Sequence, residues 1–377
     1  MRKNFLAGLT HTEFMRRHWQ KDMLLARGAL SQYAASVTRA DLLGLAQRED
    51  IESRIVRHAG DRWRVQHGPF ERRDLTRLPR LGWSLLVQGV DRVLEPVVRL
   101  LREFSFIPYA RLDDVMVSYA APGGSVGPHF DSYDVFLVQG QGKRRWRVGH
   151  QKDLTLVRDA PLRILERFTP RHEWTLESGD VLYLPPHWAH DGVALDECIT
   201  YSIGFRAPLA QELGTHFLEF LQDRLALEGV YADPDLRSTK APGRIPSGMI
   251  SSMATLLGSV RWSRKDVVEF LGCYLSEPKP SVVYSRPARA LHESTFADRA
   301  RAQGVRLAPA SRLLIYDEYV FMNGEQHRVG SRALRLFEKL ANERELGGAA
   351  AIGREAGRLL YGWYRAGYIE VGAASRP

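Results

Sequence analysis

Two residues that could bind a metal ion, His129 and Asp131, lie two positions apart in the run from 127 to 138. In an extended strand alternate side chains share a face, so the imidazole and the carboxylate are expected to project to the same side. One histidine and one carboxylate are two of the three protein ligands in the two-histidine, one-carboxylate site of non-haem iron oxygenases. Because the H-x-D pattern is short, the assignment depends on a third ligand.

The third ligand is expected from a later strand, and the segment 181–192 offers His187 and His190. His187 follows directly after two prolines that end the strand, so we expect it in a loop. His190 lies a few residues further on, where the chain can turn back toward the mouth of a barrel. We therefore predict that His129, Asp131 and His190 bind Fe(II) and form the catalytic centre.

An iron oxygenase that uses 2-oxoglutarate also needs a cation for the remote carboxylate of that cosubstrate. Strand alternation places Arg144 on the same apolar face as Trp146 and Val148, so its guanidinium is expected to enter the barrel. The fork of donors on arginine suits a carboxylate. Lys143, Arg145 and Arg147 are expected to face outward as a solvated basic surface.

Small hydroxyl side chains on other strands could add hydrogen bonds to the cosubstrate. Ser118 is one candidate, and either Thr200 or Ser202 is another. Tyr133 and Asp134, close to the first two ligands, could contact a cationic substrate, although a structural role at a strand edge is about as well supported.

The elements that position these residues are short strands separated by turns. Between 114 and 206 we expect strands at 115–120, 135–139, 144–148, 181–184 and 199–205. This spacing is typical of a small β-sandwich or barrel. The first ninety or so residues mix helical patterns (12–16, 39–46) with strands at 54–57 and 62–65 around a Gly60-Asp61 turn, and a further helix is expected at 93–104.

Beyond Pro208 the pattern becomes helical and then changes again. An apolar helical stripe covers 213–225, a Pro/Gly/Ser-rich linker covers 233–248, and Ser263 opens a further helix with a capping box. The last ninety residues combine strands at 313–316 and 319–322, an Asn323-Gly324 turn, a helix from Ser331, a helix around 359–364 that ends at Gly367, and a strand at 368–371. That order predicts a winged-helix-like domain.

Bulk composition limits the class of protein. With 377 residues the chain is long enough for two or three domains, and its 44% hydrophobic and 26% charged residues are typical of a soluble protein. We find neither a long apolar run for a membrane span nor a secretory signal at residues 1–5, and only Cys198 and Cys273 occur, so we expect a cytoplasmic protein without membrane contact, disulfide framework or cysteine zinc site. The net charge of +9 suits an acidic partner such as a ribonucleoprotein surface, or reflects only an arginine-rich genome.

Four segments together resemble the bacterial ribosomal oxygenases, which are JmjC-domain, cupin-like enzymes dependent on 2-oxoglutarate and Fe(II). These segments are 122–136, 142–149, 179–186 and 201–208, and the similarity is dense from about 107 to 208. The resemblance implies that His129, Asp131 and His190 bind iron, that Arg144 binds the remote carboxylate, and that Ser118 contacts 2-oxoglutarate. Thr200 stands where the family often has asparagine.

The resemblance also implies an overall organisation and a reaction. The fold class is α+β: a double-stranded β-helix catalytic domain with an N-terminal extension (1–208), a helical dimerisation region (209–280) and a winged-helix-like domain (281–377). The expected partners are a second copy of the chain and the sixteenth protein of the large ribosomal subunit, of which bacterial members hydroxylate an arginine. Specific DNA binding is not expected.

Two alternatives share parts of this pattern. A JmjC oxygenase that acts on histidine or lysine would have the same ligands and would differ only in its substrate pocket. A cupin-type sensor joined to a DNA-binding winged helix would fit the charge and the C-terminal pattern, but a sensor has no need of an open iron face together with Arg144.

Overall fold

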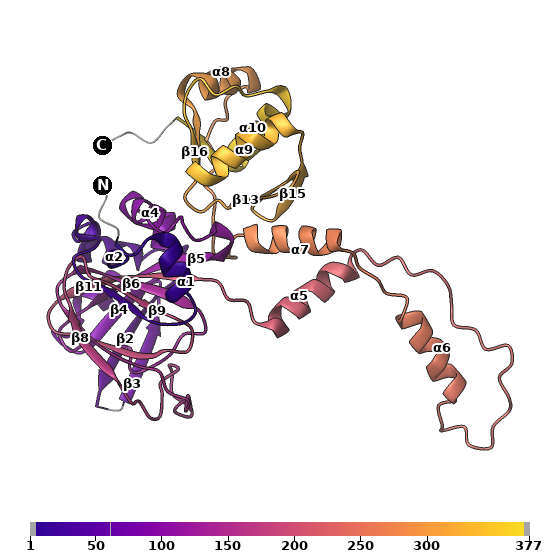
Figure 1. Cartoon of the computed structure of the whole chain (residues 1–377), viewed down its shortest axis with the longest axis horizontal. Helices are drawn as coiled ribbons and strands as arrows, with labels where there is room; N and C mark the ends of the chain where they lie inside the picture. The colour runs from indigo at the N-terminus through magenta and orange to yellow at the C-terminus, as the bar shows by residue number, and fades with distance from the viewer. Residues whose placement is uncertain (1–4, 61, 373–377) are drawn as a thin grey trace.

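The computed structural model describes residues 5–60 and 62–372. Asp61 of the predicted Gly60-Asp61 turn, and residues 1–4 of the segment considered for a secretory signal, lie outside the described residues. The part described has a β-barrel at the N-terminal end, a helical arm and a small C-terminal domain (Figure 1).

The barrel consists of two facing sheets. In the described residues the larger sheet has the strand order β1 (Leu24–Ala26), β9 (Val181–Leu184), β6 (Asp134–Gln141), β11 (Cys198–Phe205), β5 (Leu112–Ala120), β4 (Trp83–Val87), β2 (Ser53–Ala59) and β3 (Arg62–His67). The smaller sheet has the order β10 (Ala189–Ala194), β7 (Arg144–Gly149) and β8 (His172–Leu176). All the strand pairs are antiparallel, as in a double-stranded β-helix.

Apolar side chains fill both faces of the larger sheet. On one face, Phe14, Phe136, Tyr183 and Tyr201 belong to a core cluster that also contains the N-terminal helices. On the other face, Val135 and Leu137 pack with Trp146 and Val148 of the smaller sheet. The central strands of the larger sheet, such as β6 and β11, are therefore buried on both sides, and their inner face points into the barrel.

The N-terminal helices cover the outer face of the larger sheet. They are α1 (His11–Arg17), α2 (Arg39–Leu45), α3 (Arg72–Thr76) and α4 (Glu95–Arg102). Thr10 and Thr38 each accept a hydrogen bond from the third residue of the helix that follows, which satisfies a free amide of the first turn. Pro96 lies in the first turn of α4, as its sequence requires.

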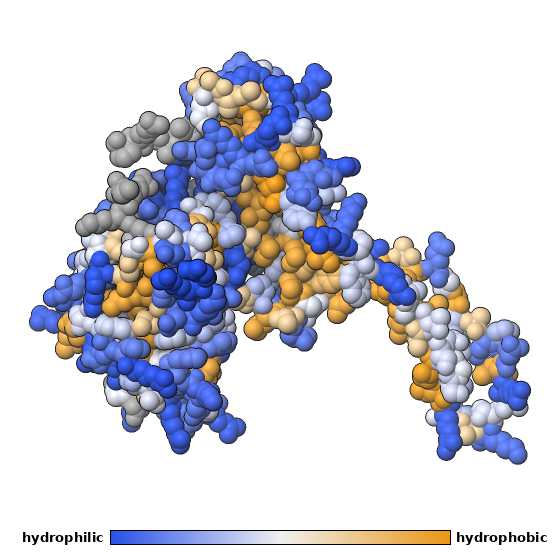
Figure 2. Space-filling view, viewed as in Figure 1, coloured by the Kyte–Doolittle hydropathy of each residue, from blue (hydrophilic) through white to orange (hydrophobic). Residues whose placement is uncertain are grey.

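Helix α5 (Ala210–Gln222) leads away from the barrel into an arm that carries α6 (Ser247–Leu257) at its far end, and α7 (Arg264–Ser276) returns from the arm to lie against the C-terminal domain (Figure 1). The predicted capping box at Ser263 is present, with Asp266 as its partner. Helix α6 was not predicted; only its first two residues, Ser247 and Gly248, had been assigned, as the end of the linker. Apolar side chains are exposed along this arm (Figure 2).

The C-terminal domain packs its own core of apolar side chains from residues 296–369. It contains α8 (Glu293–Gln303), α9 (Ser331–Glu343) and α10 (Arg354–Ala366) with two small sheets, β16 (Glu345–Leu346)–β12 (Val305–Leu307)–β17 (Ile369–Val371) and β13 (Leu313–Tyr316)–β14 (Tyr319–Met322)–β15 (Glu325–Arg328). Asn323 and Gly324 both have positive φ, as a two-residue hairpin turn requires. Gly367 ends α10 in the left-handed conformation.

Several short strands escaped prediction. β1, β4, β8 and β10 have only three to six residues each and little alternation of polar and apolar side chains. Among the described residues, no helix is both long and apolar enough to cross a membrane. The domain boundaries at 208 and 280 stay a prediction.

Candidate metal centre

His129 and Asp131 lie in the loop that precedes β6, and not in a regular strand as their spacing suggested. The loop bends at Gly123 and Gly127, both with positive φ, so regular pairing is interrupted. In the described part of the chain, this loop has a single isolated β-bridge, between His129 and His190 in β10. The amide of each histidine donates to the carbonyl oxygen of the other, at 2.9 and 2.8 Å.

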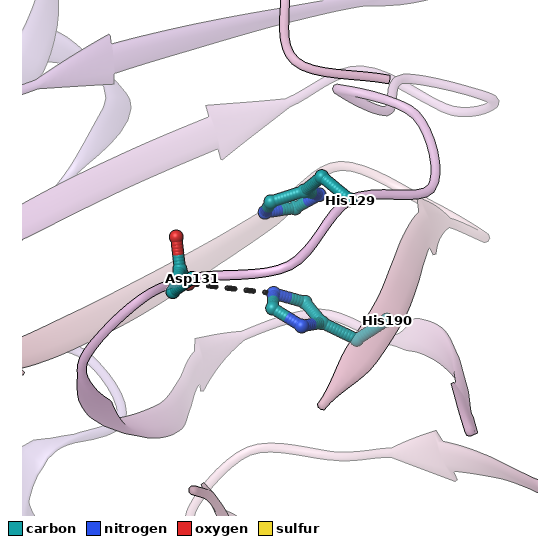
Figure 3. A group of neighbouring side chains, drawn as sticks. All are labelled: His129, Asp131 and His190. Atoms are coloured by element: carbon teal, nitrogen blue, oxygen red, sulfur yellow. Dashed lines mark ion pairs between the residues drawn. The ribbon is translucent and has the colours of Figure 1, made fainter. Parts of the chain in front are cut away.

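The structure brings the side chains of His129, Asp131 and His190 together (Figure 3), with one ligand atom of each within 4.8 Å of the others. His190 Nε2 lies 3.7 Å from Asp131 Oδ2. Each histidine places Nδ1 at 2.9 Å from a main-chain carbonyl oxygen, that of Gly127 for His129 and that of Trp188 for His190. A carbonyl can only accept, so Nδ1 carries a proton in each ring, and in the neutral form Nε2 has the free lone pair.

The environment keeps His190 neutral. Its side chain is buried, and burial together with the neighbouring His129 lowers its pKa to about 4, against the opposing effect of Asp131. A neutral imidazole is the form that binds a metal ion. Two imidazoles and a carboxylate that converge on one point fit the donor set of a non-haem Fe(II) site, with the opposite side facing a cavity.

That cavity has a volume of about 800 Å³ and extends across the inside of the barrel. The three ligand candidates lie on its wall together with Ser118 and Arg144. Arg144 is buried with Trp146 and Val148, and its guanidinium carbon lies 5.7 Å from the centre of the Trp146 ring. The parity argument therefore gave the correct direction for this side chain.

The Arg144 guanidinium has donors to spare. Nη1 donates to Ser118 Oγ at 3.4 Å, whereas Nε is buried and has no hydrogen-bond partner among the described residues. Other arginine Nε atoms of the described residues are unpartnered too, so the position of Arg144 on the cavity wall beside the ligand candidates is the more specific observation. A carboxylate in the cavity would accept hydrogen bonds from its free donors.

The hydroxyl candidates on β11 are arranged differently from each other. Thr200 Oγ1 donates to Gln139 Oε1 at 3.1 Å, and Thr200 does not appear among the residues that line the cavity. Ser202, the alternative, does line it. The role of either hydroxyl in binding a cosubstrate stays a prediction.

The remaining candidates from the sequence lie away from the ligand atoms. His187 is exposed, in a turn with positive φ. Lys143 forms an exposed ion pair with Glu177, and Arg147 pairs with Asp191. Asp134 does not line the cavity, because it is buried on the other side of the sheet, where the Tyr183 hydroxyl donates to it at 2.6 Å.

Sequence reasoning missed an acidic part of the cavity wall. Asp113 and Asp114 from the start of β5 line the cavity together with Asp131 and Tyr133. The Tyr133 ring is partly exposed while its hydroxyl is shielded, and loss of solvent and then the three carboxylates raise its pKa. Two consecutive aspartates at the start of a strand were the available signal. Lys279, which also lines the cavity, had no signal beyond its position between two prolines.

Comparison with known families matches two parts of the chain. Residues 99–213 match the JmjC domain, and residues 259–370 match the ROXA-like winged helix. These matches confirm the predicted fold class, a cupin-like JmjC domain followed by a C-terminal winged helix.

Similar proteins and structures cover nearly the whole chain. The chain is 34% identical over 322 residues to the "Ribosomal protein uL16 3-hydroxylase" of Escherichia coli K12, which covers 84% of this chain and 85% of that protein. It is 36% identical over 266 residues to a "Probable ribosomal oxygenase" of Haemophilus influenzae, with 66% and 63% covered. The X-ray structure of E. coli ycfD superimposes with a TM-score of 0.84 at 31% identity, covering 96% of this chain and 98% of that one. A ycfD structure in complex with cobalt and 2-oxoglutarate gives a TM-score of 0.82, at the same identity and coverage.

Proposed function

Because the chain belongs to the bacterial ribosomal oxygenases, a family of JmjC-domain proteins, we propose that it hydroxylates an arginine side chain of a large-subunit ribosomal protein, with uL16 as the first candidate. As a member of this family it is a 2-oxoglutarate-dependent oxygenase that uses a metal ion, and we propose Fe(II) as that ion. One observation carries the proposal: a single cavity contains the three candidate ligands, a buried arginine and two further carboxylates.

His129, Asp131 and His190 would hold the metal ion. When bound, the metal and 2-oxoglutarate supply the insertion of one oxygen atom from O₂ into a C–H bond, with release of succinate and carbon dioxide. The protein keeps the ligands ready for this chemistry. The carbonyls of Gly127 and Trp188 fix the tautomers of the two histidines, and burial keeps His190 neutral.

Arg144 and Ser118 are the proposed contacts of 2-oxoglutarate. The free Nε donor and the remaining donors of Arg144 would bind the remote carboxylate in a site that excludes bulk water. Trp146, whose ring lies beside the guanidinium, closes this end of the cavity with apolar surface.

Carboxylates gathered on one part of the cavity wall support a cationic target side chain. Asp113, Asp114 and Asp131 lie near the Tyr133 hydroxyl, while basic side chains line other parts of the same cavity, among them Arg54, Arg144 and Arg163. A guanidinium can pair with carboxylates through parallel hydrogen bonds, and Tyr133 offers an aromatic surface to its aliphatic part. These features support arginine as the target.

We further propose that α5, α6 and α7 contact a second copy of the chain. Helix α6 has no buried residue, although much of its sequence is apolar. Large apolar side chains along the arm are exposed, including Leu218, Ile250, Leu257 and Trp262 (Figure 2). A contiguous apolar surface of this kind marks an interaction site, and a symmetric dimer would bury it.

Mass spectrometry of peptides tests the proposed reaction. The protein is incubated with Fe(II), 2-oxoglutarate, O₂ and overlapping peptides of uL16, and an increase of one oxygen atom on an arginine is the expected product. His129→Ala and Asp131→Ala should abolish the product because each removes a ligand. His187→Ala, which replaces an exposed histidine near the site, is the matched control and should retain activity.

The outcomes separate the parts of the proposal. Full activity in the His129 and Asp131 variants would refute the ligand assignment. Hydroxylation of a histidine or lysine would retain the reaction class and replace the target. Succinate formation that no ribosomal peptide stimulates would refute the ribosomal substrate.

A further inference from the structure

Lys279 reaches the active-site cavity from outside the barrel. It lies between Pro278 and Pro280, in the segment that leads from α7 to the C-terminal domain. Its Nζ is 3.0 Å from Asp113 Oδ2 and 3.1 Å from Asp114 Oδ2. All three side chains line the cavity that contains the metal-ligand candidates.

The C-terminal half of the chain holds this contact in place. Arg312 of the C-terminal domain donates to the carbonyl oxygens of Leu112 and Asp113. Arg206 Nε lies 3.5 Å from Asp113 Oδ1. Burial raises the pKa of Asp113, but Lys279 and the two arginines outweigh this effect, so its pKa is below the ordinary value and the carboxylate is charged.

We propose that Lys279 determines substrate specificity by competing with the substrate for Asp113 and Asp114. The inference rests on the proposed function, in which these carboxylates receive a cationic side chain. In the free protein the Lys279 ammonium lies within hydrogen-bond distance of the Oδ2 atoms of both carboxylates, closer than Arg92, whose Nη2 is 3.6 Å from Asp114 Oδ2. An incoming cation must displace it or share its carboxylates.

This competition affects arginine and lysine differently. A substrate lysine would exchange one ammonium for another, with little net gain in hydrogen bonding. A guanidinium has five donors in a rigid fork, so it can form parallel hydrogen bonds that an ammonium cannot form. Lys279 therefore removes most of the affinity for a lysine side chain and leaves a surplus for arginine, which is selection against the wrong substrate.

Peptide binding under conditions without turnover tests the competition. The protein is loaded with Mn(II) and 2-oxoglutarate without O₂, and dissociation constants are measured for the uL16 peptide and for the same peptide with the target arginine replaced by lysine. In Lys279→Met we expect the lysine peptide to bind about tenfold more tightly, equivalent to about 1.4 kcal/mol. The affinity for the arginine peptide should increase less, so the dissociation constant of the lysine peptide divided by that of the arginine peptide should fall.

Three further measurements separate competition from a structural effect. Lys279→Arg retains the cation and should give neither peptide increased affinity. Lys152→Met, which replaces an exposed lysine outside the cavity, should leave both constants unchanged. In Lys279→Met the KM for the arginine peptide should fall while kcat and the affinity for 2-oxoglutarate stay as in the wild type, because Lys279 does not contact the metal ligands.

The results distinguish this inference from the proposed function. If the wild type hydroxylates the arginine peptide and Lys279→Met leaves the ratio unchanged, or weakens the binding of both peptides, the competition is refuted and the function stands. If the wild type binds neither peptide, the substrate assignment fails and the inference fails with it.

Discussion

Replacing Arg144 with alanine is expected to raise the KM for 2-oxoglutarate by roughly two to three and a half orders of magnitude. Arg144 is 6% exposed, so a carboxylate bound to it would be nearly as buried. Removing one partner of a buried charge pair costs about 3–5 kcal/mol, because the remaining charge loses both water and its counter-ion. At about 1.4 kcal/mol per factor of ten, this cost gives the expected range.

The contacts of Arg144 predict how two further variants behave. Arg144→Lys keeps the positive charge but loses the fork of donors. A lysine could not both bind Ser118 and present several donors to the cosubstrate, so the KM for 2-oxoglutarate is expected to rise about tenfold. Arg145→Ala removes the adjacent arginine, which does not line the cavity, and should leave the KM unchanged.

The assay is succinate formation at saturating peptide over a range of 2-oxoglutarate concentrations, with thermal unfolding measured in parallel. Thermal unfolding is needed because Arg144→Ala also leaves a space beside Trp146. An unchanged KM in a variant that remains folded would refute the assignment of Arg144 as the carboxylate anchor.

Three other predictions concern stability and assembly. Gly124→Ala should lower the free energy of unfolding by more than about 2 kcal/mol, because its Cβ would lie 2.2 Å from the main-chain oxygen of Trp83. The control is Gly44→Ala in α2, where a Cβ meets nothing within 4 Å and should stabilise the protein by up to about 1 kcal/mol. Urea titration measures both free energies of unfolding, and equal effects of the two substitutions would contradict the reasoning. Burial and, to a lesser extent, Asp114 raise the pKa of Asp91 from 3.8 to about 6. Between these two pKa values the folded protein retains a proton on Asp91 that the unfolded chain loses. The contribution of Asp91 to the free energy of unfolding therefore falls as the pH rises from 3.8 to about 6. Asp91→Asn should therefore gain up to about 3 kcal/mol relative to the wild type between pH 4 and pH 7, and a difference that does not vary with pH would count against the assignment. Leu257→Asp on α6 should convert a dimer into a monomer in light scattering, and a persistent dimer would place the contact elsewhere.

Features with a local physical cause could be predicted from the sequence. The capping box at Ser263, the turn at Asn323-Gly324 and the end of α10 at Gly367 each depend on residues within a few positions of one another. The direction of Arg144 followed from the two-residue repeat of a strand, which is also local.

Features that depend on distant parts of the chain could not be predicted in this way. The H-x-D segment was interpreted as a strand, yet within residues 5–60 and 62–372 its one bridge is to His190, about sixty residues later. Asp134 was considered as a substrate contact, but it lies on the opposite side of the sheet from the cavity, where it accepts a hydrogen bond from the hydroxyl of Tyr183. The contact of Lys279 with Asp113 joins residues 166 positions apart, and no periodicity in either segment indicates it.

The reciprocal main-chain bonds between His129 and His190 have a consequence for how the protein acquires its metal. In a hydrogen-bonded antiparallel pair the α-carbons are held about 5.5 Å apart, so the spacing of the two imidazoles is set by the backbone before any ion arrives. Metal uptake then requires no refolding of the loop, and the rate should follow the loss of water from the incoming ion. The main-chain amides of His129 and His190 should therefore exchange slowly with deuterium in the metal-free protein. Slow exchange would show that the two histidines are held in place before the metal ion binds.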